Sequence, residues 1–187
     1  KIYQDKHRPL SDRIRALQQA RLTFKQARDY PRFLEWGDKV ATFMIAASKK
    51  DTSIRKDYYS YLAQLAKTFW SQDDAIMAKE ILAKMLRLRD LPITNLIEAL
   101  WIRSAMSLEA KNYNHAIDTL IQIKKILPQN HDLKEKILWT LAWTNYLQQN
   151  YNDADESLRY LISKTKSETF INRANFWRGK IALKINN

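Results

Sequence analysis

The sequence predicts an all-α protein, an α-solenoid of about nine helices paired into antiparallel hairpins. Three observations support this prediction: a scarcity of glycine, an internal repeat, and a helical spacing of apolar residues. The 187 residues include only two glycines, whereas a β-sandwich, a β-barrel or a Gly-rich phosphate loop needs several for its turns and close backbone approaches. The lack of cysteine excludes disulfide-stapled folds, thiolate nucleophiles and zinc sites with Cys ligands.

The internal repeat has a period of 38 residues. Residues 112–120 (NYNHAIDTL) recur as residues 150–158 (NYNDADESL), and Trp101, Trp139 and Trp177 follow one another at the same interval. The register is recognisable from about residue 60 to residue 185. A fixed period of roughly 20 to 50 residues is typical of proteins in which each repeat buries its apolar face against the next. We therefore expect stacked hairpins rather than a globule.

Each repeat divides into two helices. Ala116, Leu120 and Ile123 lie on one face of a helix, and polar breaks at residues 110–112 and 148–150 precede the second helix of two successive repeats. Apolar spacing, together with boundaries marked by Ser11 and by the prolines Pro31, Pro92 and Pro128, places the helices in order. We expect them at residues 11–29, 32–49, 53–71, 73–88, 93–111, 114–126, 132–148, 152–164 and 168–185.

These helices predict an N-terminal tail at residues 1–10 and a single helical-repeat domain at residues 11–187. The formal net charge is +12, with the basic excess near both ends of the chain and a neutral middle. Such a charge attracts anionic partners without specifying a fold. The longest apolar runs, such as residues 43–47, are far shorter than the roughly 18 residues of a membrane span, so we expect no membrane-spanning helix.

The repeats resemble the tetratricopeptide repeat (TPR) family, in which apolar and small residues alternate through two helices. The matching residues are Leu100, Ser104, Tyr113, Ala116, Leu120, Ile123 and Pro128 in one repeat and Leu138, Leu141, Ala142, Tyr151, Ala154, Leu158 and Leu161 in the next. The period of 38 departs from the usual value of about 34, and Arg103 stands where an apolar residue is usual. The resemblance implies a TPR-like superhelix whose first helices line a concave binding surface.

A narrower resemblance covers residues 172–183 (NRANFWRGKIAL), which look like the superhelix that precedes the catalytic domain of soluble lytic transglycosylases. That family cleaves peptidoglycan with a Glu-Ser pair followed by a Gly-rich stretch ending in Gly-Leu-Met-Gln. Here the one Glu-Ser pair, Glu156-Ser157, lies inside a repeat helix, and no such stretch follows it. The resemblance implies a non-catalytic segment of such an enzyme, located in the periplasm or cell envelope.

Catalytic or metal chemistry has little support in the sequence. His7, His115 and His131 have no spacing that would place two of them on one helix face. The paired acidic residues fall at predicted helix starts, where they complement the helix dipole. We therefore expect a chain that is not an enzyme and that needs neither a cofactor nor a metal.

Aromatic residues are the first candidate for a binding surface. Trp139, Trp143 and Tyr146 at i, i+4 and i+7 share one side of a first helix, while Trp101, Trp139 and Trp177 would form a ladder across three adjacent first helices. Flat rings can stack on sugar rings, peptide side chains or bases. The alternative interpretation is that these rings fill the seam between neighbouring first helices.

A basic stripe is the second candidate. Arg21, Lys25, Arg28 and Arg32 follow a 4, 3, 4 spacing, which predicts one basic stripe along the first helix. Together they can meet phosphates or cell-wall carboxylates. The alternative is that their long side chains lie along the edge of the core with only the charged ends in water.

The leading functional hypothesis is a non-catalytic scaffold whose concave face binds a protein or an extended peptide. The alternative is the peptidoglycan-binding superhelical segment of a periplasmic lytic transglycosylase. A third hypothesis, single-stranded RNA binding, is disfavoured because the repeats lack a regularly placed polar pair that could read bases. Apolar residues around much of the helix at 168–185 further predict that another repeat, a following domain or a second copy packs on it.

Overall fold

The computed structural model describes residues 2–185. Within this range every regular element is a helix, which confirms the all-α prediction. Residue 1 of the predicted tail and residues 186–187 of the predicted domain lie outside the described residues. None of the helices in this range is both long enough and apolar enough to cross a membrane.

The described residues form nine α-helices, and each begins and ends within three residues of its expected position. They are α1 (Leu10–Gln26), α2 (Tyr30–Ser48), α3 (Ser53–Ser71), α4 (Ala75–Leu86), α5 (Ile93–Glu109), α6 (Tyr113–Ile126), α7 (Lys134–Leu147), α8 (Tyr151–Lys164) and α9 (Glu168–Ile185). A 3₁₀ turn, η1 (Ile2–Gln4), precedes them.

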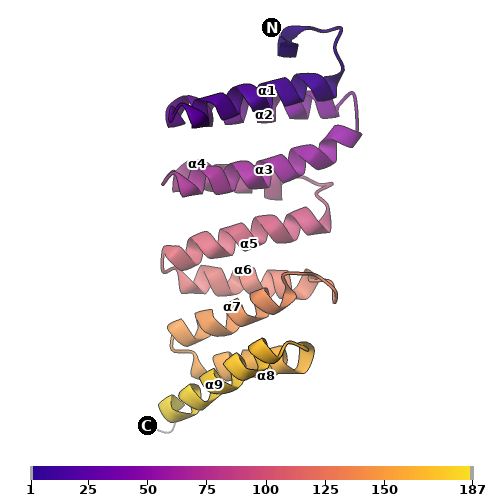
Figure 1. The fold of residues 1–187 in the computed structure, drawn as a ribbon. Coiled ribbons are helices and arrows are strands. Elements are labelled where there is room, and N and C mark those ends of the chain that lie inside the picture. Colours follow the sequence, from indigo (N-terminus) through magenta and orange to yellow (C-terminus); the bar gives the residue numbers. More distant parts are fainter. Residues whose placement is uncertain (1, 186–187) are drawn as a thin grey trace. The chain divides into compact units, whose positions relative to one another are not determined.

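The chain divides into two compact units, one up to Leu91 and one from Pro92. In unit 1, α1 pairs with α2, α2 packs on α3, and α3 pairs with α4. In unit 2, α5 pairs with α6, α6 packs on α7, α7 pairs with α8, and α8 packs on α9 (Figure 1). Each unit is therefore a run of hairpins that contact their neighbours in the sequence. The expectation of a single domain stays a prediction.

All four hairpins use the same turn. The second residue past the first helix of each hairpin has a positive φ of 56–64°. The residue that follows it is the N-cap of the second helix. These pairs are Arg28-Asp29, Asp73-Asp74, Lys111-Asn112 and Gln149-Asn150. In the α5–α6 turn, the Asn112 N–H donates to the carbonyl of Ser107 and the Lys111 N–H to that of Leu108, the Schellman pattern that closes helix ends. The last three turns are 38 residues apart, so the sequence repeat is a repeat of this turn.

The core of unit 2 near its C-terminal end is built from α7, α8 and α9. Leu138 and Ala142 of α7 are buried with Leu158 of α8 and with Ala174 and Ile181 of α9. Leu138 and Ala142 are four residues apart and Ala174 and Ile181 are seven apart, spacings that place each pair on one side of its helix. The same spacing leaves an adjacent side of α7 for its aromatic residues.

The predicted N-terminal tail is anchored on unit 1 through its described residues. The ring of Tyr3 meets Trp36 of α2 edge-on, with ring centroids 6.1 Å apart. Nε of Arg13 in α1 donates a hydrogen bond of 2.9 Å to the carbonyl of Tyr3. These contacts hold η1 against the first hairpin.

Candidate functional site

Three aromatic residues on one side of α7 form a stacked column, which we call the α7 aromatic column: Trp139, Trp143 and Tyr146. Trp139 and Trp143 are nearly parallel with centroids 6.5 Å apart, and Trp143 and Tyr146 are nearly parallel at 5.4 Å. The i, i+4, i+7 spacing predicted that these three rings share one side of the helix. Stacked and packed rings lose little further freedom when a ligand binds, which favours binding.

Trp177 of α9 meets this column edge-on. Its centroid lies 4.7 Å from that of Trp143 and 5.0 Å from that of Tyr146. The space left among these rings, Leu158 and Ile181 is only about 10 Å³, no more than one water molecule requires. A ligand therefore cannot enter between α7 and α9 and must instead lie over the outer edges of the rings.

Cations lie over the tryptophans that are 38 residues apart. The guanidinium of Arg173 in α9 lies 3.9 Å from the centroid of Trp139, and Nζ of Lys136 in α7 lies 5.5 Å from that of Trp101. Each of these two tryptophans thus faces a cation from the next first helix. The positive charge is attracted to the electron-rich face of the ring. The sequence analysis did not identify Lys136 or Arg173, because a cation over a ring leaves no signal within one helix.

Burial differs among the five predicted aromatic residues. Trp139 is 8% exposed and belongs to the unit 2 core, as the seam interpretation proposed for it. Trp101, Trp143, Tyr146 and Trp177 are half-buried. The structure thus brings four of the rings together across α7 and α9, while Trp101 on α5 pairs with a lysine.

The predicted basic stripe is divided between core and surface, and its first member, Arg21, is 8% exposed. Its Nε donates to the carbonyl of Phe33 at 3.1 Å, and Nη1 donates to the hydroxyl of Tyr61 at 3.1 Å. That hydroxyl donates in turn to the carbonyl of Gly37 at 3.1 Å. Burial lowers the pKa of Arg21 and raises the pKa of Tyr61 to about 12. Arg21 is therefore a structural residue that joins α1, α2 and α3.

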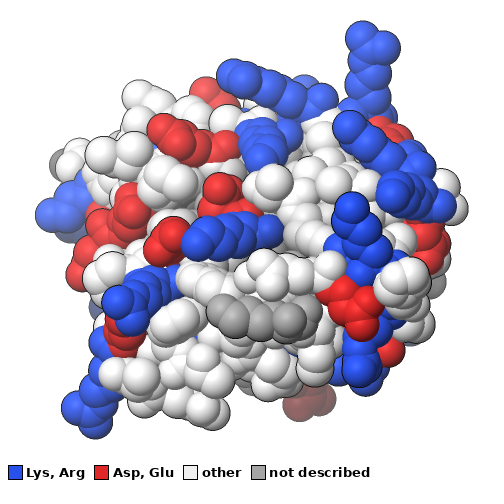
Figure 2. All heavy atoms as spheres, turned by 90° about the horizontal axis from the view of Figure 1, so that it is seen from above, with Lys and Arg blue, Asp and Glu red and all other residues white. Residues whose placement is uncertain are grey.

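The prediction that all four residues of the stripe lie along the first helix is wrong, because α1 ends at Gln26: Lys25 is in α1, Arg28 is in the turn and Arg32 is in α2. These three side chains are exposed. Arg28 occupies the left-handed position of that turn, and Arg32 forms an ion pair of 3.5 Å with Asp29. Figure 2 shows several Lys and Arg side chains close together on the right of the view, with Asp and Glu side chains beside them, and a mixture of both signs elsewhere on that face.

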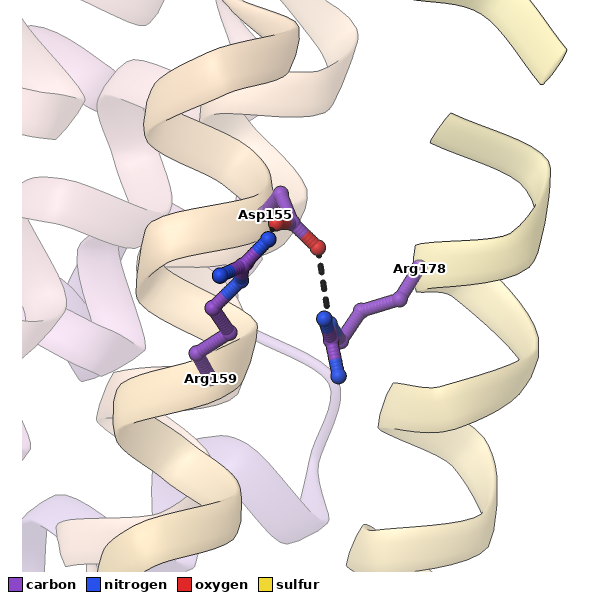
Figure 3. Close-up of polar contacts among 3 residues, drawn as sticks. All are labelled: Asp155, Arg159 and Arg178. Atoms are coloured by element: carbon purple, nitrogen blue, oxygen red, sulfur yellow. Dashed lines mark hydrogen bonds and ion pairs between the residues drawn. The ribbon is translucent and has the colours of Figure 1, made fainter. Parts of the chain in front are cut away.

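A charged cluster that the sequence analysis missed lies between α8 and α9 (Figure 3). Asp155 accepts hydrogen bonds of 2.7 Å from Nε of Arg178 and 2.7 Å from Nε of Arg159. Burial alone would raise the pKa of Asp155, but the bonds from both arginines outweigh it and hold this pKa below its ordinary value. The i, i+4 spacing of Asp155 and Arg159 was a usable signal, whereas Arg178 joins them only through tertiary packing.

The described histidines have local partners. Nδ1 of His115 lies 2.8 Å from the hydroxyl of Ser107, and Nδ1 of His131 accepts from the N–H of Leu133 at 3.1 Å. Among residues 2–185, no group of three or more His, Cys, Asp or Glu side chains is arranged so that it could hold a metal ion.

Comparison with known proteins gives one informative result. No protein-family model and no curated protein matches the chain. Among solved structures, the chain is similar to the "MamA RS-1 ArsTM double mutant", a TPR-like protein, with a TM-score of 0.60 and 13% sequence identity. The match covers 96% of this chain and 88% of the other. This likeness shows the fold, a TPR-like helical-repeat solenoid; the resemblance to lytic transglycosylases has no such support.

Proposed function

We propose that the chain is a non-catalytic scaffold that binds a protein or an extended peptide along the first helices of unit 2. The observation that carries this proposal is the α7 aromatic column, which is packed against Trp177 and has the guanidinium of Arg173 over Trp139. Tryptophan, tyrosine and arginine are the residues most enriched at the energetic centres of protein interfaces. Rings fixed by stacking offer apolar area for binding at low entropic cost. The TPR-like fold also supports the role of a scaffold that binds other proteins.

The chemistry of the surface also suggests what the peptide contains. Half-buried Trp143, Tyr146 and Trp177 present apolar edges, while exposed Arg173 supplies positive charge over Trp139 at one end of the column. A segment with an aromatic or aliphatic side chain and a nearby carboxylate satisfies both. We therefore place the proposed peptide across α7 and α9, with its acidic residue toward Arg173.

Selection from a display library of random 16-residue peptides tests this function. Calorimetry would then measure the affinity of selected peptides for the wild type, Trp143→Ala and Trp36→Ala. We expect Trp143→Ala to weaken binding at least about tenfold, which corresponds to roughly 1.4 kcal/mol. Trp36→Ala is the matched control, because Trp36 is half-buried in unit 1, and it should change affinity less than about twofold. Equal effects of the two substitutions, or none from Trp143→Ala in a folded chain, would contradict the proposal.

The peptidoglycan alternative uses the same rings as stacking faces for sugars. Muropeptides should be titrated in parallel with the selected peptides. Muropeptide binding that depends on Trp143, in the absence of any peptide ligand, would favour a role in peptidoglycan turnover. A single-stranded RNA oligonucleotide completes the comparison, since binding through phosphates would fall steeply with added salt.

A further inference from the structure

A small groove lies among three helices of unit 2. It is lined by residues of α6, α7 and α8 that include Ile121, Asn145 and Glu156, and we call it the α6–α8 groove. Its volume is about 190 Å³. Pockets for cofactors and drug-sized ligands have volumes of roughly 300–1,000 Å³. The α6–α8 groove is therefore of a size to hold a single side chain rather than a cofactor.

The α6–α8 groove and the α7 aromatic column lie on opposite sides of α7. Leu141 lines the groove and follows Trp139 of the column by two residues. Two residues of an α-helix correspond to a rotation of about 200°, so these two side chains point in nearly opposite directions. A ligand in the groove is thus distinct from the peptide proposed for the column.

The groove also lies inside the run of hairpins. Helices α6 and α8 both pack on α7, and α9 follows on α8. In a repeat protein each repeat contacts only its neighbours, so any repeat that followed α9 would pack on α8 and α9 and would not reach α6. We therefore attribute an occupant of the groove to another molecule.

One end of the groove is acidic. Asn145 lies four residues before Gln149, the left-handed residue of the α7–α8 turn, and Asp153 lies four residues after it, so the hairpin brings both to one end. Glu156 follows Asp153 by three residues on the same side of α8. Neither carboxylate forms an ion pair with another residue of 2–185, although the formal net charge of the chain is +12.

A buried amide at this end lacks a donor. Asn145 is only 5% exposed. Its Nδ2 donates a hydrogen bond of 3.1 Å to the carbonyl of Leu141 in the same helix, whereas its Oδ1 accepts from no residue within 2–185. Buried side-chain oxygens normally have a hydrogen-bond partner. Asn145 therefore indicates a donor that enters the groove from outside.

The other end of the groove carries a positive charge. Nζ of Lys124 in α6 lies 4.2 Å from the ring centroid of Tyr160 in α8. Ile117 and Ile121 precede Lys124 by roughly two turns and one turn of α6 and supply an apolar wall, and Ile121 is 37% exposed. A cationic ligand is thus repelled from the Lys124 end and attracted to the acidic end, which fixes its direction in the groove.

We propose that the α6–α8 groove binds one arginine side chain of a partner protein. Its methylene groups lie along Ile117 and Ile121. Its guanidinium donates to the carboxylates of Asp153 and Glu156 and to Oδ1 of Asn145. A guanidinium has five N–H donors in a planar fork and so satisfies three acceptors at once, whereas the ammonium group of lysine has three donors and is more strongly hydrated.

An NMR titration of the full chain with N-acetylarginine methylamide tests this inference. The signals to follow are the side-chain amide of Asn145 and the backbone amides of α6 and α8. We expect a Kd of about 1 mM, which is typical of a ligand of this size. N-acetylcitrulline methylamide has nearly the same shape without the charge, and it should bind at least about tenfold more weakly.

Two glutamine variants separate the groove from the general charge of the chain. Glu156→Gln removes one of the two acceptor carboxylates and should weaken binding of the arginine compound at least about fivefold. Glu168→Gln is the matched control, because Glu168 is an exposed carboxylate in the first turn of α9, and it should change the affinity less than about twofold. Glu156 is also exposed, so neither variant should disturb the fold.

Four results would overturn this inference. They are unchanged Asn145 signals at about 20 mM of the arginine compound, equal affinities for the arginine and citrulline compounds, and equal effects of the two glutamine variants. The fourth is a concentration-dependent dimer of the wild type that Glu156→Gln abolishes, because the occupant would then be a second copy. Trp143→Ala should leave the affinity for the arginine compound within about twofold, so failure of the random-peptide selection would count against the aromatic site only.

Discussion

The left-handed residue in the α5–α6 turn leads to a prediction with a definite sign. Lys111 has a φ of 56°, a conformation that costs a residue with a Cβ about 1–2 kcal/mol. Glycine removes this cost, but it also gives the unfolded chain more conformational freedom, which lowers the free energy of unfolding by about 0.4–1 kcal/mol. We therefore predict that Lys111→Gly raises the free energy of unfolding by about 0.5–1 kcal/mol, the difference between these two effects.

The adjacent residue provides the control. Ala110 has a φ of −74°, where glycine relieves no strain, so Ala110→Gly should lower stability by about 0.5–1 kcal/mol. Urea unfolding followed by circular dichroism at 222 nm measures both changes. Shifts of the two variants in the same direction, or a destabilised Lys111→Gly, would refute the strain argument.

Three further changes test the packing and the charges. Trp139→Ala removes a buried ring and should lower the free energy of unfolding by about 3–5 kcal/mol. The control Trp101→Ala removes a half-buried ring and should cost less than half as much. Equal losses in the two variants would contradict the burial of Trp139. Gly37→Ala places a methyl group 2.5 Å from Leu65 Cδ1 and should lower the free energy of unfolding by about 1–3 kcal/mol through overpacking. A variant that is more stable than the wild type in thermal unfolding would show that α2 and α3 are further apart. Asp155 has a pKa below its ordinary 3.8, because hydrogen bonds from two arginines outweigh the opposing effect of burial. The ionised carboxylate therefore stabilises the folded chain at pH values above 3.8. This contribution is lost as the pH falls through the lower pKa of the folded state. The destabilisation by Asp155→Asn in urea should therefore be full near neutral pH and disappear in strong acid; a difference that grows in acid would contradict the sign.

The helices were predictable because their signals are local. The polar breaks at residues 110–112 and 148–150 coincide with the observed turns, and Asn112 caps α6 through a side-chain bond to the N–H of His115. The 38-residue offset followed from identical turns. Neither the left-handed φ of Lys111 nor that of Gln149 was predictable, because lysine and glutamine carry no sequence signal for that conformation.

The candidate sites were only partly predictable. The stacking within α7 depends on spacing along one helix, and spacing indicated it correctly. The burial of Arg21 depends instead on Phe33 and Tyr61, which lie on other helices and supply its acceptors and ring contacts. Likewise, Arg173 lies over Trp139 because of how α9 is placed against α7, which no pattern within a single helix reveals.

The attachment of α9 determines whether the α7 aromatic column stays assembled. Helix α9 is held by α8 and only weakly by α7, so its detachment breaks fewer contacts than an opening in the interior of the unit. Its backbone amides should therefore exchange hydrogen fastest among those of α5–α9. Such an opening also removes Arg173 and Trp177 from the α7 rings. Any contact that stabilises the docked position of α9 therefore suppresses these openings and keeps Trp177 against the α7 rings.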